Sequence, residues 1–63
     1  SFVQYLNDYR LTRAARFLAM TSRDVLEIAI DSGFSNISYF NRLFKKKFHM
    51  TPMEYRKIRV KEL

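Results

Sequence analysis

The chain has 63 residues, so it forms one small domain at most and hides about 60% of the surface of the unfolded chain on folding. Without cysteine it has no disulfide, thiolate zinc site or thiol nucleophile. Hydrophobic residues make up 48% of the chain and include six Phe and four Tyr, which excludes a disordered segment. Twelve Lys and Arg against six Asp and Glu give a net charge of +6, which points to an anionic partner.

The charge belongs to the C-terminal third of the chain. Residues 1–41 contain four cationic and four acidic residues, whereas residues 42–63 contain eight cationic and two acidic ones. A solvated basic surface kept only for solubility is the plain alternative to an anion-binding surface. No apolar run approaches the roughly 18 residues of a membrane span, and no signal-peptide pattern is present, so we expect a cytoplasmic chain. Because it begins at Ser1 without Met, we expect a fragment of a longer protein.

Apolar residues recur at spacings of three and four, and the strand signals are weak, which predicts four helices. The first covers about residues 2–20, where Ser1 and Gln4 resemble a capping box. Its predicted inner face consists of Phe2, Leu6, Leu11, Ala14, Ala15 and Leu18. Arg10 on this helix is a candidate partner for Glu27 or Asp31.

The second predicted helix is short. Possible caps lie in residues 21–24, and Val25, Ile28 and Ala29 form its inner face. Gly33, the only glycine, ends this helix in the left-handed conformation and lets Phe34 pack back onto the core.

The third predicted helix runs from about residue 36 to 47, with Ser35 or Asn36 as its cap. At 100° per residue its apolar and polar residues separate onto two faces. The core face holds Ile37, Phe40, Leu43, Phe44 and Phe48. The outer face holds Ser38, Asn41, Arg42, Lys45 and Lys46.

The fourth predicted helix begins at Thr51-Pro52-Met53-Glu54, which combines a capping hydroxyl, proline at the first helical position and an acidic partner. It runs to about residue 60. Tyr55 and Ile58 are expected to pack inward, and the cations Arg56, Lys57, Arg59 and Lys61 to stay in water.

A helix, a turn built on Gly33 and a second helix with a polar and basic outer face follow the helix-turn-helix plan. Such a helix fits the major groove of duplex DNA, where base edges are distinguishable. Arg42 suits guanine, Asn41 suits adenine, and Ser38 suits either kind of edge. Ile37 suits a thymine methyl group. The phosphates suit Lys45 and Lys46.

The sequence resembles the C-terminal DNA-binding signature of the AraC/XylS family of bacterial transcription regulators over nearly all of its length. The matching positions are Glu27-Ile28-Ala29, Gly33-Phe34, Ser38-Tyr39-Phe40, Arg42, Phe44-Lys45-Lys46, Thr51-Pro52 and Tyr55-Arg56, and residues Tyr5-Leu6, Arg10-Leu11, Ala14 and Leu18 resemble the linker helix of the family. One departure is His49, where the family commonly has glycine; histidine tolerates the left-handed conformation better than a β-branched residue.

The resemblance implies an all-α fold, a small homeodomain-like bundle of four helices with one helix-turn-helix. Residues 1–21 would be the linker helix and residues 22–63 the second helix-turn-helix unit with its C-terminal helix. The first unit and a sensor domain would be absent from this chain. The implied function is sequence-specific binding of double-stranded DNA in transcription regulation, mostly activation. The implied base-facing residues are Ile37, Ser38, Asn41 and Arg42, and we assign Ser35, Asn36, Lys45, Lys46 and Arg56 to the phosphates.

Other functions fit the residues less well. The best alternative is a helical module that docks on an acidic protein such as RNA polymerase or the missing sensor domain. The aromatic residues at helical spacing suit a core better than a platform for single strands. We expect neither enzyme activity nor a metal or cofactor, because the sequence has no paired carboxylates, activated nucleophile or glycine loop, and His49 stands alone.

Overall fold

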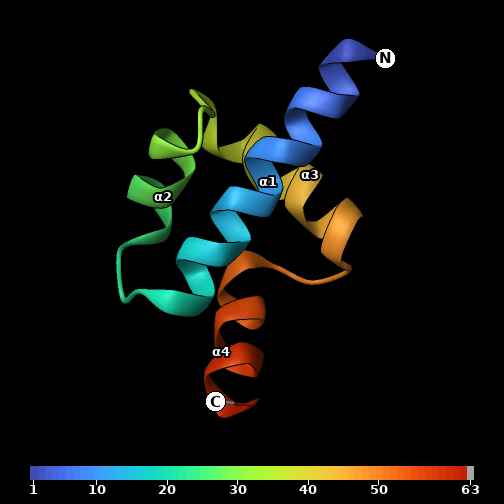
Figure 1. The fold of residues 1–63 in the computed structure, drawn as a ribbon. Coiled ribbons are helices and arrows are strands. Elements are labelled where there is room, and N and C mark those ends of the chain that lie inside the picture. The colour runs from blue at the N-terminus through green and yellow to red at the C-terminus, as the bar shows by residue number, and fades with distance from the viewer. Residues whose placement is uncertain (63) are drawn as a thin grey trace.

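The computed structural model describes the backbone of residues 1–62 and the side chains of residues 1–59. Over that part of the chain it contains four helices and no strand: α1 (Phe2–Met20), α2 (Val25–Asp31), α3 (Ile37–Phe48) and α4 (Pro52–Glu62). The predicted all-α fold is confirmed. In Figure 1, α1 runs through the middle of the molecule, between α2 and α3, and α4 continues the long axis toward the C-terminus. The prediction that Lys61 is exposed lies outside the described side chains.

Two helices begin with the capping boxes that the sequence predicts. The Gln4 N–H donates to Ser1 Oγ at 3.3 Å, and the Ser1 amino group donates to Gln4 Oε1 at 3.1 Å. At the start of α4, the Glu54 N–H donates to Thr51 Oγ1 at 3.1 Å and the Thr51 N–H donates to Glu54 Oε1 at 2.8 Å. These bonds satisfy backbone donors that have no partner inside the helix, so they fix where α1 and α4 begin.

The turn between α2 and α3 also follows the prediction. Gly33 has φ +108°, a conformation that other residues rarely adopt, and Phe34 turns back into the core with its N–H bound to the Ala29 carbonyl at 3.0 Å. Asn36 caps α3: its Oδ1 accepts from the Tyr39 N–H at 3.0 Å. Asn36, and not Ser35, is therefore the cap of this helix.

The core lies where α1, α2 and α3 meet. Its buried members are Leu11, Ala14, Ala15, Leu18, Ile28, Ala29, Phe34, Phe40 and Phe44. Phe40 and Phe44 are fully buried, and their ring centroids lie 5.7 Å apart. Tyr55 from α4 meets Phe44 edge-on at 5.6 Å. The aromatic residues of α3 thus serve as core, as predicted, and connect α3 to α4.

Three details differ from the predictions. Phe2 is 76% exposed because the first turns of α1 extend beyond the other helices (Figure 1). Ile58 is 45% exposed and therefore does not pack inward as expected. The predicted pairing of Arg10 is also wrong: Glu27 and Asp31 pair with Arg23, while the Arg10 side chain lies over the backbone of Gly33.

Within residues 1–62, no helix is both long enough and apolar enough to cross a membrane.

Candidate nucleic-acid interface

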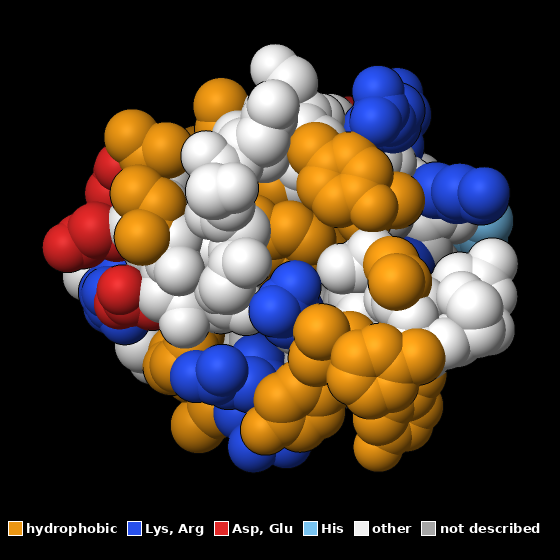
Figure 2. Space-filling view, turned by 90° about the horizontal axis from the view of Figure 1, so that it is seen from above, with side chains coloured by type: hydrophobic (Ala, Val, Ile, Leu, Met, Phe, Trp, Pro, Cys, Tyr) orange, Lys and Arg blue, Asp and Glu red, His pale blue; other side chains and the backbone are white. Residues whose placement is uncertain are grey.

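The outer face of α3 carries the polar and cationic residues that the helical wheel assigns to it. Ser38, Asn41, Arg42, Lys45 and Lys46 are all exposed. Among the described residues, Arg42, Lys45 and Lys46 take part in no ion pair. Their charge is therefore available to a partner. In Figure 2, acidic side chains gather at the left edge of the molecule and cationic side chains project at the opposite edge, beside the histidine.

A groove of about 670 Å³ runs along this face, between α3 and the first turn of α4. Its lining residues come from three helices and the turn before α4: Val25, Asn41, Arg42, Lys45, Lys46, Thr51, Pro52 and Met53. The α3 cations give the groove its positive charge, whereas the Glu54 carboxylate caps the N-terminus of α4 and offsets the dipole of that helix. The cations favour an anionic ligand such as a phosphate backbone.

The remaining predicted residues near the start of α3 lie at the same end of the helix. Ser35 is exposed just before the cap. The side-chain oxygen of Asn36 is used by the Tyr39 N–H, so only its amide N–H groups remain for a phosphate. Ile37 is half-buried and packs against the core, which leaves part of its side chain at the edge of the outer face.

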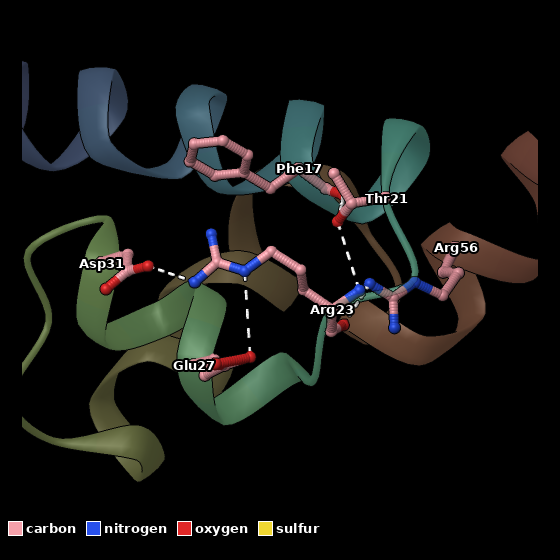
Figure 3. Close-up of polar contacts among 6 residues, drawn as sticks. All are labelled: Phe17, Thr21, Arg23, Glu27, Asp31 and Arg56. Atoms are coloured by element: carbon pink, nitrogen blue, oxygen red, sulfur yellow. Dashed lines mark hydrogen bonds and ion pairs between the residues drawn. The ribbon is translucent and has the colours of Figure 1, made fainter.

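Arg56 is the predicted phosphate-facing residue whose guanidinium the protein itself already binds. Its Nε donates to the Leu18 carbonyl at 3.1 Å, and its Nη2 donates to the Arg23 carbonyl at 2.6 Å. Figure 3 shows Arg56 reaching from α4 toward the end of α1 and the segment that leads to α2. Leu18 and Arg23 lie 38 and 33 residues away in sequence, so Arg56 connects three elements of the fold.

Arg23 forms a second polar cluster, which was not predicted. Its guanidinium bonds to the Asp31 carboxylate and lies 3.8 Å from Glu27 Oε1 (Figure 3). The hydrogen bond that Arg23 donates to Asp31 raises the pKa of Arg23 above its ordinary value. The signal was present in the sequence, because Glu27 and Asp31 follow Arg23 by four and eight residues, which places both on one face of α2.

Two contacts between α1 and α3 were also missed. Asn7 Nδ2 donates to the Tyr39 hydroxyl at 3.1 Å, and Lys47 Nζ lies 3.5 Å from Asp8 Oδ1. Lys47 thus faces α1 and not the groove. Residues 7 and 39 are 32 positions apart, and periodicity within a helix carries no signal for such a pair.

His49 ends α3 in the left-handed conformation, with φ +63°, and its N–H donates to the Lys45 carbonyl at 2.7 Å. This is the structural role expected for a residue at a position where glycine is common. Among the described residues, no cluster of three or more His, Asp or Glu side chains is arranged to hold a metal ion.

These features define a helix-turn-helix unit whose second helix presents a cationic, hydrogen-bonding face. Comparison with protein families agrees: residues 1–58 match the family described as helix-turn-helix domain. The chain belongs to this family, in its AraC/XylS-type form.

Several curated proteins are similar to the chain. It is 48% identical over 56 residues to "HTH-type transcriptional activator RhaR" of Mannheimia succiniciproducens, covering 89% of this chain and 20% of that protein. It is 38% identical over 53 residues to "Regulatory protein SoxS" of Salmonella typhimurium, covering 84% of this chain and 50% of that protein. It is 36% identical over 58 residues to "Bifunctional transcriptional activator/DNA repair enzyme AdaA" of Bacillus subtilis, covering 92% and 28%.

The relatives are mostly transcription regulators, and the chain spans half of their length or less. No solved structure matches it at a significant level.

Proposed function

We propose that this chain binds double-stranded DNA in a sequence-specific manner, as part of a transcription regulator, with α3 lying in the major groove. The observation that carries the proposal is the outer face of α3, where exposed hydrogen-bonding residues precede exposed cations along one helix. An α-helix fits the major groove, and side chains on its outer face then reach base edges and phosphates.

The order of residues along α3 assigns their roles. Ile37, Ser38, Asn41 and Arg42 lie nearer the N-terminal end, and they are the residues that would meet base edges. Lys45 and Lys46 follow one turn later and line the groove beside α4, where a phosphate strand would pass. Ser35 and the Asn36 amide would donate to phosphates before the helix, and Arg56 only through the guanidinium N–H groups that its two carbonyl bonds leave free.

We also propose how this chain fits into a longer protein. Residues 1–21 act as a linker helix and residues 22–63 as the second DNA-binding unit of a longer cytoplasmic regulator. The first turns of α1 support this, because Phe2, Val3, Tyr5 and Tyr9 are exposed large hydrophobic residues that need a covering surface. The names of the relatives RhaR and AdaA as transcriptional activators favour activation, and an activator meets RNA polymerase.

Docking on an acidic protein is the second candidate, because the same cationic groove fits carboxylates as well as phosphates. It predicts no preference among duplex sequences.

The test is fluorescence anisotropy with duplexes selected by the chain from a random-sequence pool, measured at several salt concentrations. With about three to five phosphate contacts, log Kd changes with log salt by a slope of about 3 to 4.5 in magnitude. Arg42→Ala lowers the preference at one base position, about 5- to 150-fold, whereas Lys45→Ala weakens all duplexes alike. Arg16→Ala, an exposed cation on α1, is the matched charge control. Binding that shows no preference among duplex sequences, or no dependence on salt, refutes the proposal.

A further inference from the structure

A chain of contacts joins α1 to the base-facing Arg42 through Tyr39. Asn7 Nδ2 donates to the Tyr39 hydroxyl at 3.1 Å, and the guanidinium carbon of Arg42 lies 5.4 Å from the centre of the Tyr39 ring. We propose that Tyr39 and Asn7 are positioning residues: they hold the Arg42 guanidinium in place for its base, so that sequence preference at that base depends on α1. This inference rests on the proposed function and names how the same site obtains its selectivity.

Tyr39 is suited to act as a platform because it is held at several points. Its backbone N–H donates to the Asn36 cap at 3.0 Å, and its ring meets Phe34 with centroids 6.3 Å apart. Its hydroxyl is held by Asn7 from another helix. The backbone, the ring and the hydroxyl are thus fixed by different elements, which leaves the half-buried ring little freedom to turn.

Arg42 gains its direction from this platform. It is exposed, and among the described residues its guanidinium forms no hydrogen bond or ion pair and lies over one ring, that of Tyr39. The contact with the ring uses none of the guanidinium N–H groups as hydrogen-bond donors to another described residue, so they remain able to donate to a base. A guanidinium that is already oriented loses less conformational freedom when DNA binds, and it meets a base edge in fewer wrong geometries.

The two neighbouring lysines provide a contrast. Lys45 and Lys46 are exposed like Arg42, but within the described residues neither stacks on an aromatic ring. A phosphate contact needs a charge at the right distance and not a fixed plane, whereas bidentate recognition of a base needs the plane. The side chain that needs orientation is the one that has a platform.

A second contact from α1 keeps α3 in register with this platform. Asp8 lies next to Asn7, and its carboxylate lies 3.5 Å from Lys47 Nζ in the last turn of α3. Adjacent residues of α1 therefore hold the first and the last turn of α3. A rotation of α3 that moved Arg42 away from its base would break both contacts.

The experiment measures selectivity, defined as the ratio of Kd for a duplex substituted at the base pair that Arg42 reads to Kd for the preferred duplex. The preferred duplex is selected from a random pool by the wild-type chain, and the base pair is the one whose preference disappears in Arg42→Ala. Tyr39→Leu removes the ring and lowers selectivity about two- to fivefold, the range of one exposed cation–π contact. Tyr39→Phe and Asn7→Ala each lower it about twofold. Tyr9→Phe, at an exposed tyrosine of α1, leaves it unchanged.

A double variant separates positioning from a direct contact. In an Arg42→Ala background, Tyr39→Leu causes no further loss of affinity for the preferred duplex, because the side chain it positions is gone. An equal loss in both backgrounds, or a uniform weakening on all duplexes, overturns the proposal. Circular dichroism shows whether each variant folds. If Tyr39→Leu does not fold, Tyr39→Phe and Asn7→Ala provide the test. Unchanged selectivity in both of these variants overturns the proposal. Absence of salt-dependent duplex binding by the wild type would instead refute the proposed function.

Discussion

The contact of Arg56 with two backbone carbonyls predicts that this residue stabilises the fold more than it contributes to binding. Arg56→Met keeps most of the apolar stem but removes both hydrogen bonds, at 3.1 Å to Leu18 and 2.6 Å to Arg23. A hydrogen bond to a charged group contributes about 1.5–3 kcal/mol, and partial exposure of Arg56 places these bonds at the lower end of that range. The two together give a loss of about 3 kcal/mol.

Thermal unfolding followed by circular dichroism measures this loss. In a domain of this size, about 3 kcal/mol lowers Tm by about 12–24 °C. Arg16→Met, the same substitution at an exposed position of α1, changes Tm by only a few degrees. The salt dependence of duplex binding is measured on the same variants below their melting range. An unchanged Tm together with a salt slope smaller by about 1 would refute the reasoning, because Arg56 would then act as a phosphate contact.

Three further predictions concern the turns and caps. Gly33→Ala destabilises the chain by about 1–3 kcal/mol in urea unfolding, because φ is +108° and the new Cβ would lie 2.8 Å from Arg10 Nε. Adding Arg10→Ala removes the clash and recovers only that part of the lost stability. Full recovery of stability in the double variant would exclude backbone strain at Gly33. His49→Gly at φ +63° raises stability by up to about 1 kcal/mol in thermal unfolding, and a loss would contradict the strain. The hydrogen bond from the Thr51 N–H holds the pKa of Glu54 below its ordinary value. The Glu54 carboxylate therefore stabilises the fold above pH about 4.3, and this stabilisation is lost as pH falls through the lowered pKa of Glu54 in the folded state. Melting curves of wild type and Glu54→Gln should therefore converge in acid, and a constant difference would contradict this.

The helices and their ends were predictable because the signals are local. Each capping box joins residues three positions apart, and the outer face of α3 follows from a fixed rotation per residue. The left-handed turn at Gly33 and the strained end at His49 also needed only the residue type and its place after a helical pattern. Such features depend on a few neighbouring residues, so tertiary packing did not have to be known.

The polar contacts between helices were not predictable in the same way. Asn7 with Tyr39 and Arg56 with Leu18 join positions more than 30 residues apart. Their geometry depends on the rotation of one helix against another, which a hydrophobic pattern defines only to within part of a turn. The error on Arg10 has the same origin: two arginines had suitable chemistry, and only the packing of α1 against the turn decides that Arg10 covers Gly33.

The exposure of the ends of α1 and α4 marks another limit of pattern reading. Phe2 and Ile58 occupy positions that helical periodicity assigns to an inner face, yet both are exposed. Periodicity gives the direction of a side chain but not the extent of the surface it meets. More of the candidate site could be predicted, because the exposure of Ser38, Asn41 and Arg42 follows directly from the direction of these side chains on α3.

The cationic side chains that the structure describes form two groups, those that contact the protein itself and those that remain exposed without an ion pair. Lys47 of α3 pairs with Asp8 of α1, and Arg56 of α4 bonds to the carbonyls of Leu18 and Arg23, so these two cations join helices. Arg23 bonds to acidic residues of α2, the helix that follows it. Arg42 and its neighbouring lysines keep their charge on the outer face of α3. A small core contributes little free energy of unfolding, and polar contacts between helices add to it. Of these contacts, the pair of Lys47 with Asp8 joins α3 to α1, so it also orients the surface that we propose reads DNA.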